Sequence, residues 1–231
     1  MSGSLGALAL AALVFVGGHF VLSSAPVRGA LIARLGRVPF TGLYAVFAGA
    51  TFTWLVIAYG GAPFTELWGD PGWARYLVLL VMPFAAILVV CGVLTPNPTG
   101  LLGEQARARD DPAPGIFKVT RHPVMSAIAL WAAAHLIANG DGASLIFFGA
   151  ILLLALGGVA HMEARWRAKG DPGWHRVVAA TSVMPFAAAW EGRARIGLAE
   201  IGWGRMALGV GLYFVLLFGH QWAIGASPGP L

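Results

Sequence analysis

The basic residues of this chain are confined to a few gaps between long apolar stretches. Fourteen of its fifteen lysines and arginines lie in three of the five gaps, and only Arg75 falls elsewhere. Hydrophobic residues make up 58% of the chain and charged residues 11%, against about 25% charged residues in an ordinary soluble domain. The pattern therefore predicts an all-α, multi-pass membrane protein.

Six apolar stretches approach the length of about 20 residues that a membrane-spanning helix needs. Their predicted bounds are 4–24, 39–60, 74–95, 123–139, 143–161 and 206–224. The fourth is short, and Pro83 in the third is expected to kink its helix or to leave a carbonyl open to another partner. The first lacks a basic start, so we interpret it as a retained helix and not a signal peptide. We predict one six-helix bundle in a single domain, 1–231, with short interfacial helices in the basic gaps.

The basic gaps also predict orientation. They follow the first, third and fifth stretches, and short basic loops stay on the cytoplasmic side, so both termini are expected to face outward from a bacterial-type cytoplasmic membrane. The net charge of +5 then reflects topology and contact with anionic lipid headgroups, and it does not indicate nucleic-acid binding. In the last gap, the apolar segment Val177–Trp190 is too short to span and is expected at the membrane interface. The single cysteine, Cys91, excludes an intrachain disulfide and is expected to be buried.

Histidines within or beside the apolar stretches are the main candidates for chemistry, because a histidine can stay neutral in a membrane and still bind a metal. They are His19, His122, His135, His161 and His220, whereas His175 is expected to be solvated. A lone intramembrane histidine is most often a packing residue, and small neighbours such as Gly17 and Gly18 also serve helix packing. Two imidazoles from different helices, set among Phe, Leu and Gly, suit haem iron better than they suit a zinc cage. The residues alone leave both interpretations open.

An ordered set of motifs resembles the NnrU family, which includes the 15-cis-zeta-carotene isomerases of plants and bacteria. The set covers most of the chain, and its members are Gly18-His-Phe-Val-Leu-Ser-Ser24 with Arg28, Gly36-Arg37, Tyr44, Thr120-Arg-His-Pro, Trp131-Ala-Ala-Ala-His135, Thr181-Ser-Val-Met-Pro-Phe186 and Trp190-Glu-Gly-Arg193.

The resemblance implies an integral membrane protein that holds haem b through two histidines, which match His19 and His135. It further implies a haem-dependent cis–trans isomerase of a lipophilic polyene. Many bacterial members are associated instead with denitrification and nitrogen-oxide metabolism, so a catalytic role, a nitric-oxide sensor and an accessory protein all stay open. Ala132 stands where plant members have a cysteine, so a switch to thiolate ligation does not carry over.

Geometry leaves the pair of iron ligands open. The rise per residue places His19 and His135 at depths about 10 Å apart, and His161 and His122 match the depth of His19 better, which makes them the replacement candidates. Four arginines are expected to pair with the haem propionates, because guanidinium groups bind carboxylates bidentately. These are Arg28, Arg37, Arg121 and Arg193.

A second resemblance points to another class of enzyme. Membrane methyltransferases of the isoprenylcysteine carboxyl type are similar to Arg121-His122-Pro123, to the later Glu163 with Arg167, and to a tail with Gly170, Trp174 and Pro185. In those enzymes the Arg-His-Pro region and a later Glu help to bind S-adenosylmethionine. The structural alternative is that Arg121 reaches toward the membrane surface, that Pro123 starts a helix and that Glu163 pairs with Arg167 one turn away. Oligomeric state stays open, since a Gly-rich bundle is compatible with a monomer or a homo-oligomer.

Overall fold

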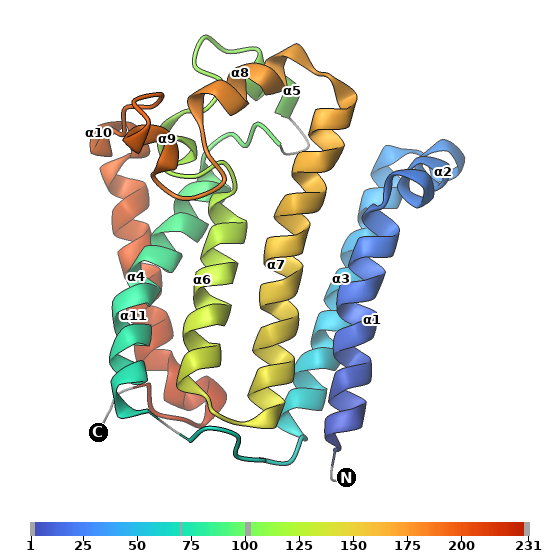
Figure 1. Cartoon of the computed structure of the whole chain (residues 1–231), viewed down its shortest axis with the longest axis vertical. Coiled ribbons are helices and arrows are strands. Elements are labelled where there is room, and N and C mark those ends of the chain that lie inside the picture. Colours follow the sequence, from blue (N-terminus) through green and yellow to red (C-terminus); the bar gives the residue numbers. More distant parts are fainter. Residues whose placement is uncertain (1–2, 70, 100–102, 229–231) are drawn as a thin grey trace. The chain divides into compact units, whose positions relative to one another are not determined.

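The chain folds into helices of two kinds, long apolar ones and short ones in the basic gaps. A computed structural model describes residues 3–69, 71–99 and 103–228. In chain order the elements are α1 (Leu5–Ser23), α2 (Ala25–Leu35), α3 (Arg37–Gly60), α4 (Gly72–Leu94), α5 (Gly103–Arg107), the 3₁₀ helix η1 (Gly115–Lys118), α6 (Pro123–Ala138), α7 (Gly142–Lys169), α8 (Pro172–Ala180), α9 (Ala187–Trp190), α10 (Leu198–Ile201) and α11 (Trp203–Ile224) (Figure 1).

Five helices of the described part are long and apolar enough to cross a membrane, namely α1, α3, α4, α7 and α11. The prediction of a helical, multi-pass membrane protein is thereby confirmed. The count of six is not confirmed, because α6 has only 16 residues. Such a helix is about 24 Å long at 1.5 Å per residue, and the hydrocarbon core of a bilayer is about 30 Å thick.

Helix α7 differs most from its predicted bounds. The apolar run was expected to end at 161, but the helix continues to Lys169. Two turns that were predicted as loop are therefore helical, and they carry Glu163, Arg165 and Arg167. Their polar character set the predicted end, whereas helix formation itself tolerates Glu, Arg and Lys well.

The chain divides into two compact units. The N-terminal unit comprises residues 1–70 together with 135–154, and the C-terminal unit comprises 71–134 together with 155–231. In the N-terminal unit α1 and α3 pack closely, because Gly18 leaves room for the ring of Phe47. Tyr59 of α3 donates or accepts a hydrogen bond with Ser144 of α7 at 2.9 Å. The prediction of a single domain stays a prediction.

The C-terminal unit is built on α4, α6 and α11, with short helices gathered at one end of them (Figure 1). Its apolar core joins residues of α4 and α6 to the loop around η1 and to α10; the buried members are Ala85, Leu88, Cys91, Ala113, Ile116, Phe117, Val119, Ala127 and Ile201. Cys91 is fully buried, as predicted. The segment Val177–Trp190 forms no spanning helix but the end of α8, a turn and α9. Its exposed Met184 and Trp190 suit an interfacial position.

Pro83 lies inside α4 without ending it. Because proline has no N–H, the carbonyl of Leu79 four residues earlier has no intrahelical partner. The hydroxyl of Tyr213 on α11 donates to that carbonyl at 3.4 Å. The predicted open carbonyl is therefore present, and it links α4 to α11.

Replacing Tyr213 with phenylalanine is expected to lower the free energy of unfolding by about 0.6 kcal/mol, the average for hydrogen bonds between membrane helices. The ring stays in place and only the donor is lost. Thermal unfolding of the purified protein in detergent measures the change. In a Pro83→Ala background the helix can satisfy the Leu79 carbonyl itself, so the same substitution should then have a smaller effect; an equal effect in both backgrounds would contradict the assignment.

Candidate functional site

The C-terminal unit contains a buried cluster of charged residues. Arg121 and His122 lie just before α6 and are 5% and 4% exposed. Arg121 Nη1 donates to Glu163 Oε2 on α7 at 2.5 Å, and His122 Nε2 lies 2.8 Å from Glu163 Oε1. Because an ionised carboxylate only accepts, Nε2 of His122 carries the hydrogen. One carboxylate thus ties the start of α6 to α7 through both of its oxygens.

The segment around Arg121 pairs with the segment that follows α8. Arg121 donates from Nε to Thr181 Oγ1 at 2.8 Å, from Nη2 to the Thr181 carbonyl at 3.2 Å and from its backbone N–H to the Ser182 carbonyl at 2.7 Å. Thr120 Oγ1 donates to the Val183 carbonyl at 2.9 Å. Both segments belong to the sequence motifs noted above, and the fold brings them together.

Aromatic rings extend this cluster. Arg121 lies over the ring of Trp174 at 5.2 Å, and Trp174 stacks on Trp166 with centroids 5.4 Å apart. Arg107 lies over Trp166 at 4.3 Å and forms an ion pair with Asp171 at 3.0 Å. Cation–π contacts of this kind hold cations beside apolar surface. The cluster therefore links α5, α7 and α8 to the start of α6.

Arg193 donates hydrogen bonds to backbone carbonyls at the C-terminal end of α8. Its Nη1 lies within hydrogen-bonding distance of the carbonyls of Val178, Ala179 and Thr181, at 2.8–3.2 Å. The last carbonyls of a helix have no intrahelical donor, so a cation at this place is favourable. Glu191 accepts from Nε of the same guanidinium at 2.7 Å.

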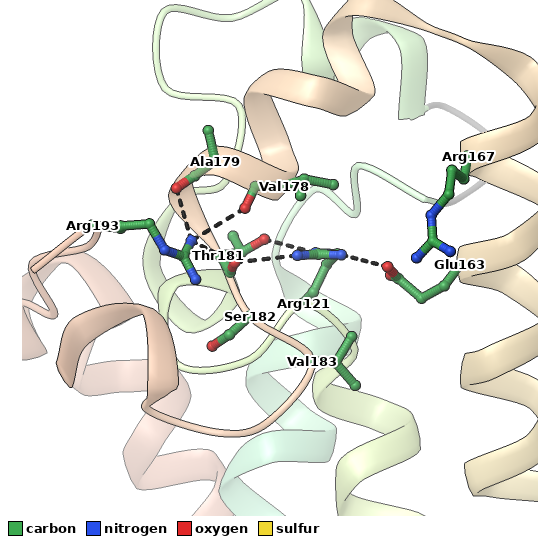
Figure 2. A pocket seen from close by; sticks show the side chains of 9 residues that line it. All are labelled: Arg121, Glu163, Arg167, Val178, Ala179, Thr181, Ser182, Val183 and Arg193. Carbon is green, nitrogen blue, oxygen red and sulfur yellow. Dashed lines mark hydrogen bonds and ion pairs between the residues drawn. The ribbon is translucent and has the colours of Figure 1, made fainter. Parts of the chain in front are cut away.

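A surface pocket of about 530 Å³ opens between these groups (Figure 2). Three arginines and one carboxylate line it together with apolar and hydroxyl side chains: Arg121, Glu163, Arg167, Val178, Ala179, Thr181, Ser182, Val183 and Arg193. Figure 2 shows Arg121 between Thr181 and Glu163, with Arg167 on α7 beyond them. All of these residues belong to the C-terminal unit.

A second polar cluster joins η1 to α10. Lys118 Nζ lies 2.7 Å from Asp111 Oδ2 and 2.7 Å from Glu200 Oε1, which also accepts from the Gly115 N–H at 2.8 Å. Burial opposes charge on Lys118, but its hydrogen bonds to both carboxylates outweigh burial and raise its pKa. Burial likewise opposes charge on Asp111, and hydrogen bonds from Lys118 and the Ala113 N–H outweigh it and lower the pKa. These contacts hold η1 against α10.

His19 lies on α1 among aromatic side chains of the N-terminal unit. Its ring packs edge-on against Phe15 at 4.6 Å and Tyr44 at 5.5 Å. Nδ1 lies 2.5 Å from the Phe15 carbonyl. A carbonyl only accepts, so Nδ1 carries the hydrogen and the lone pair of the neutral ring is on Nε2. Metal-binding histidines have this arrangement, so His19 fits the role predicted for it.

The other histidines have different surroundings. His135 on α6 stacks on Phe148 with centroids 5.2 Å apart. His161 is half-buried on α7. His122 uses Nε2 for Glu163. His220 on α11 donates from Nδ1 to the Ala226 carbonyl at 2.8 Å, and His175, placed on α8, is exposed as predicted.

The predicted iron ligands and propionate partners stay predictions. No group of three or more His, Cys, Asp or Glu side chains suited to a metal occurs among the described residues, but two axial haem ligands do not form such a group. Arg28 lies over the Phe40 ring at 5.6 Å, and Arg37, the first residue of α3, is exposed. Arg121 and Arg193 instead direct their guanidinium groups to protein acceptors.

Sequence reasoning grouped Arg121, His122 and Glu163 correctly but paired Glu163 wrongly. The structural alternative pairs Glu163 with Arg167, whereas Glu163 binds Arg121 and His122, and Arg121 is buried. The prediction that Pro123 begins a helix is confirmed. Trp166 was missed, and Trp174 was noted only in the tail of the methyltransferase resemblance and not as a contact of Arg121.

These features define a multi-pass helical membrane protein with a polar cluster where the short helices meet the long ones. A sequence profile described as NnrU protein matches residues 7–228. The chain therefore belongs to the NnrU family. A curated relative, the chloroplastic 15-cis-zeta-carotene isomerase of Zea mays, is 26% identical over 194 residues, which are 81% of this chain and 51% of the relative. The chain spans about half the length of that relative, and no solved structure matches it.

The comparisons give no support to the methyltransferase alternative. The cluster of Arg121, His122 and Glu163 that it required does exist, but its members bind one another. A cofactor carboxylate or amine would have to compete with these short contacts.

Proposed function

We propose that this protein is a haem b-binding membrane isomerase that converts a cis double bond of a lipophilic polyene to trans. The family membership and the similarity to a zeta-carotene isomerase support this class of reaction. His19 and His135, which both belong to the N-terminal unit, are the proposed axial ligands. A role in nitrogen-oxide metabolism stays a sequence-based prediction that no contact favours.

The surroundings of His19 are the observation that carries the proposal. The Phe15 carbonyl holds the hydrogen on Nδ1, so Nε2 presents its lone pair without a change of tautomer. Helix α1 is apolar, and the rings of Phe15, Tyr44 and Phe47 surround the imidazole. Such apolar surroundings suit an imidazole ligand for iron.

Bound haem would supply a Lewis acid or a one-electron donor to the double bond without net redox change. The chain's own side chains orient the histidine ring and provide apolar surface beside it. Phe15 fixes the His19 ring, while Tyr44 and Phe47 provide apolar surface where a polyene could lie. The propionate carboxylates need cationic partners, for which Arg28 and Arg37 are the candidates in the same unit as His19.

Absorption spectroscopy of the purified protein, expressed with ample haem, tests the cofactor. We expect a Soret band and sharp α and β bands on reduction, lost in His19→Ala and in His135→Ala. His220→Ala is the matched control, because His220 also binds a carbonyl through Nδ1 and should leave the spectrum unchanged. A colourless wild-type protein, or spectra that survive both substitutions, would contradict the proposal.

Isomerisation of 15-cis-zeta-carotene in detergent micelles, followed by chromatography, tests the activity separately. We expect turnover by the wild type and by His220→Ala, and none by His19→Ala. Equal turnover by haem-loaded and haem-free protein would remove the haem-dependent mechanism. A haem spectrum without turnover would leave a haem protein with a different substrate or a sensory role.

A further inference from the structure

The pocket in the C-terminal unit has an excess of positive charge at its wall. Three arginines line it with a single carboxylate, Glu163. Both oxygens of that carboxylate already accept hydrogen bonds, one from Arg121 and one from His122. The negative charge of Glu163 is therefore directed into the protein, and the pocket is suited to an anion.

Arg167 has donors available for such an anion. In the part of the chain that the structure describes, its guanidinium makes no hydrogen bond or ion pair. Arg121 uses three of its five N–H hydrogens for Thr181 and Glu163. The pocket thus offers one uncommitted guanidinium at its rim and a second, buried one with donors left over.

The pocket lies near a membrane surface. Helix α7 has 28 residues, a length of about 42 Å, which exceeds the hydrocarbon thickness of about 30 Å. The apolar part of α7 ends near residue 161, and Arg167 follows it by about 9 Å along the axis. Val178 and Val183 add apolar surface beside the arginines. Charge and apolar surface at this depth suit an amphiphile with an anionic headgroup.

We propose that this pocket binds the phosphate of an anionic phospholipid headgroup. Arg167 forms the direct ion pair, because guanidinium groups match phosphate oxygens in a bidentate geometry. Arg121 supplies further donors, and Val178 and Val183 contact the apolar part next to the headgroup. Free inorganic phosphate shares the same chemistry, and the experiment distinguishes the two sources.

Native mass spectrometry of the full-length protein in detergent tests the proposal, with equimolar phosphatidylglycerol and phosphatidylcholine as probes. The wild type should retain phosphatidylglycerol preferentially. Arg167→Gln should weaken that retention by about tenfold, as expected when one hydrogen-bonded charge is lost. Arg195→Gln is the matched control, because Arg195 is exposed and does not line the pocket. Both arginines are at the surface, so both variants should fold.

Equal retention of the two lipids by the wild type would overturn the proposal, and so would equal losses in Arg167→Gln and Arg195→Gln. A titration with inorganic phosphate separates the sources. If millimolar phosphate leaves phosphatidylglycerol bound, the ligand is the lipid. If phosphate displaces the lipid and itself binds less well to Arg167→Gln, the phosphate site is supported with the free ion as its source.

Discussion

Replacing Glu163 with leucine is expected to lower the free energy of unfolding by about 3 kcal/mol, the lower end of the range for breaking a buried ion pair. The substitution leaves the charge of Arg121, which is 5% exposed, without its carboxylate. His122 also loses the acceptor of its Nε2 hydrogen. Thermal unfolding, followed by the fluorescence of the nine tryptophans, should show a melting temperature lower by about 6–12 °C.

Two controls separate this effect from a general loss of surface charge. Glu191→Leu breaks an ion pair with Arg193 in which the side chain of Arg193 is 36% exposed and that of Glu191 is 56% exposed. Exposed ion pairs contribute about 0–1 kcal/mol. The double variant Arg121→Met/Glu163→Leu removes both buried charges and should lose less stability than the sum of its single variants. Additive losses, or equal losses at Glu163 and Glu191, would show that the buried pair is not coupled.

The long helices could be predicted from the sequence because apolar length alone determines them. The predicted stretch 4–24 corresponds to α1 at Leu5–Ser23, and 206–224 corresponds to α11 at Trp203–Ile224. The predicted stretch 143–161 does not give the end of α7 at Lys169, because hydropathy marks where a helix leaves the membrane and not where its hydrogen bonds stop. Helix α2 (Ala25–Leu35) is a short helix in the first basic gap, where such helices were predicted without bounds.

The candidate site could be predicted only as a set of residue types. Spacing suggested that Glu163 pairs with Arg167 one turn away, but local spacing cannot show which distant segment packs against α7. The segment before α6 provides Arg121 and His122, and the turn after α8 holds Arg121 in place through Thr181. These pairings depend on tertiary packing between segments that are 42 and 60 residues apart in the sequence.

The interpretation of small residues beside His19 illustrates the same limit. From the sequence alone, Gly18 is compatible either with space for a cofactor or with close helix packing. A Cβ atom at Gly18 would overlap the ring of Phe47, so this glycine serves the contact between α1 and α3. The tautomer of His19 could likewise not be predicted from the sequence, because it is set by the hydrogen bond from Nδ1 to the Phe15 carbonyl one turn earlier. The proposed iron site therefore has its support in backbone geometry and not in composition.

Replacing Gly209 with leucine is expected to lower the free energy of unfolding by about 3 kcal/mol, the upper part of the usual range for overpacking. A Cβ atom there would lie 2.7 Å from the backbone Cα of Ile87, so α11 would have to move away from α4. Gly211, two residues further on the same helix, has no neighbouring heavy atom within 4 Å of a Cβ. Gly211→Leu should therefore raise stability by up to about 1 kcal/mol, the helix-propensity gain over glycine. Thermal unfolding of both variants should show a lower melting temperature for Gly209→Leu and a slightly higher one for Gly211→Leu. A loss of stability of similar size at both positions would contradict the close packing of α4 against α11.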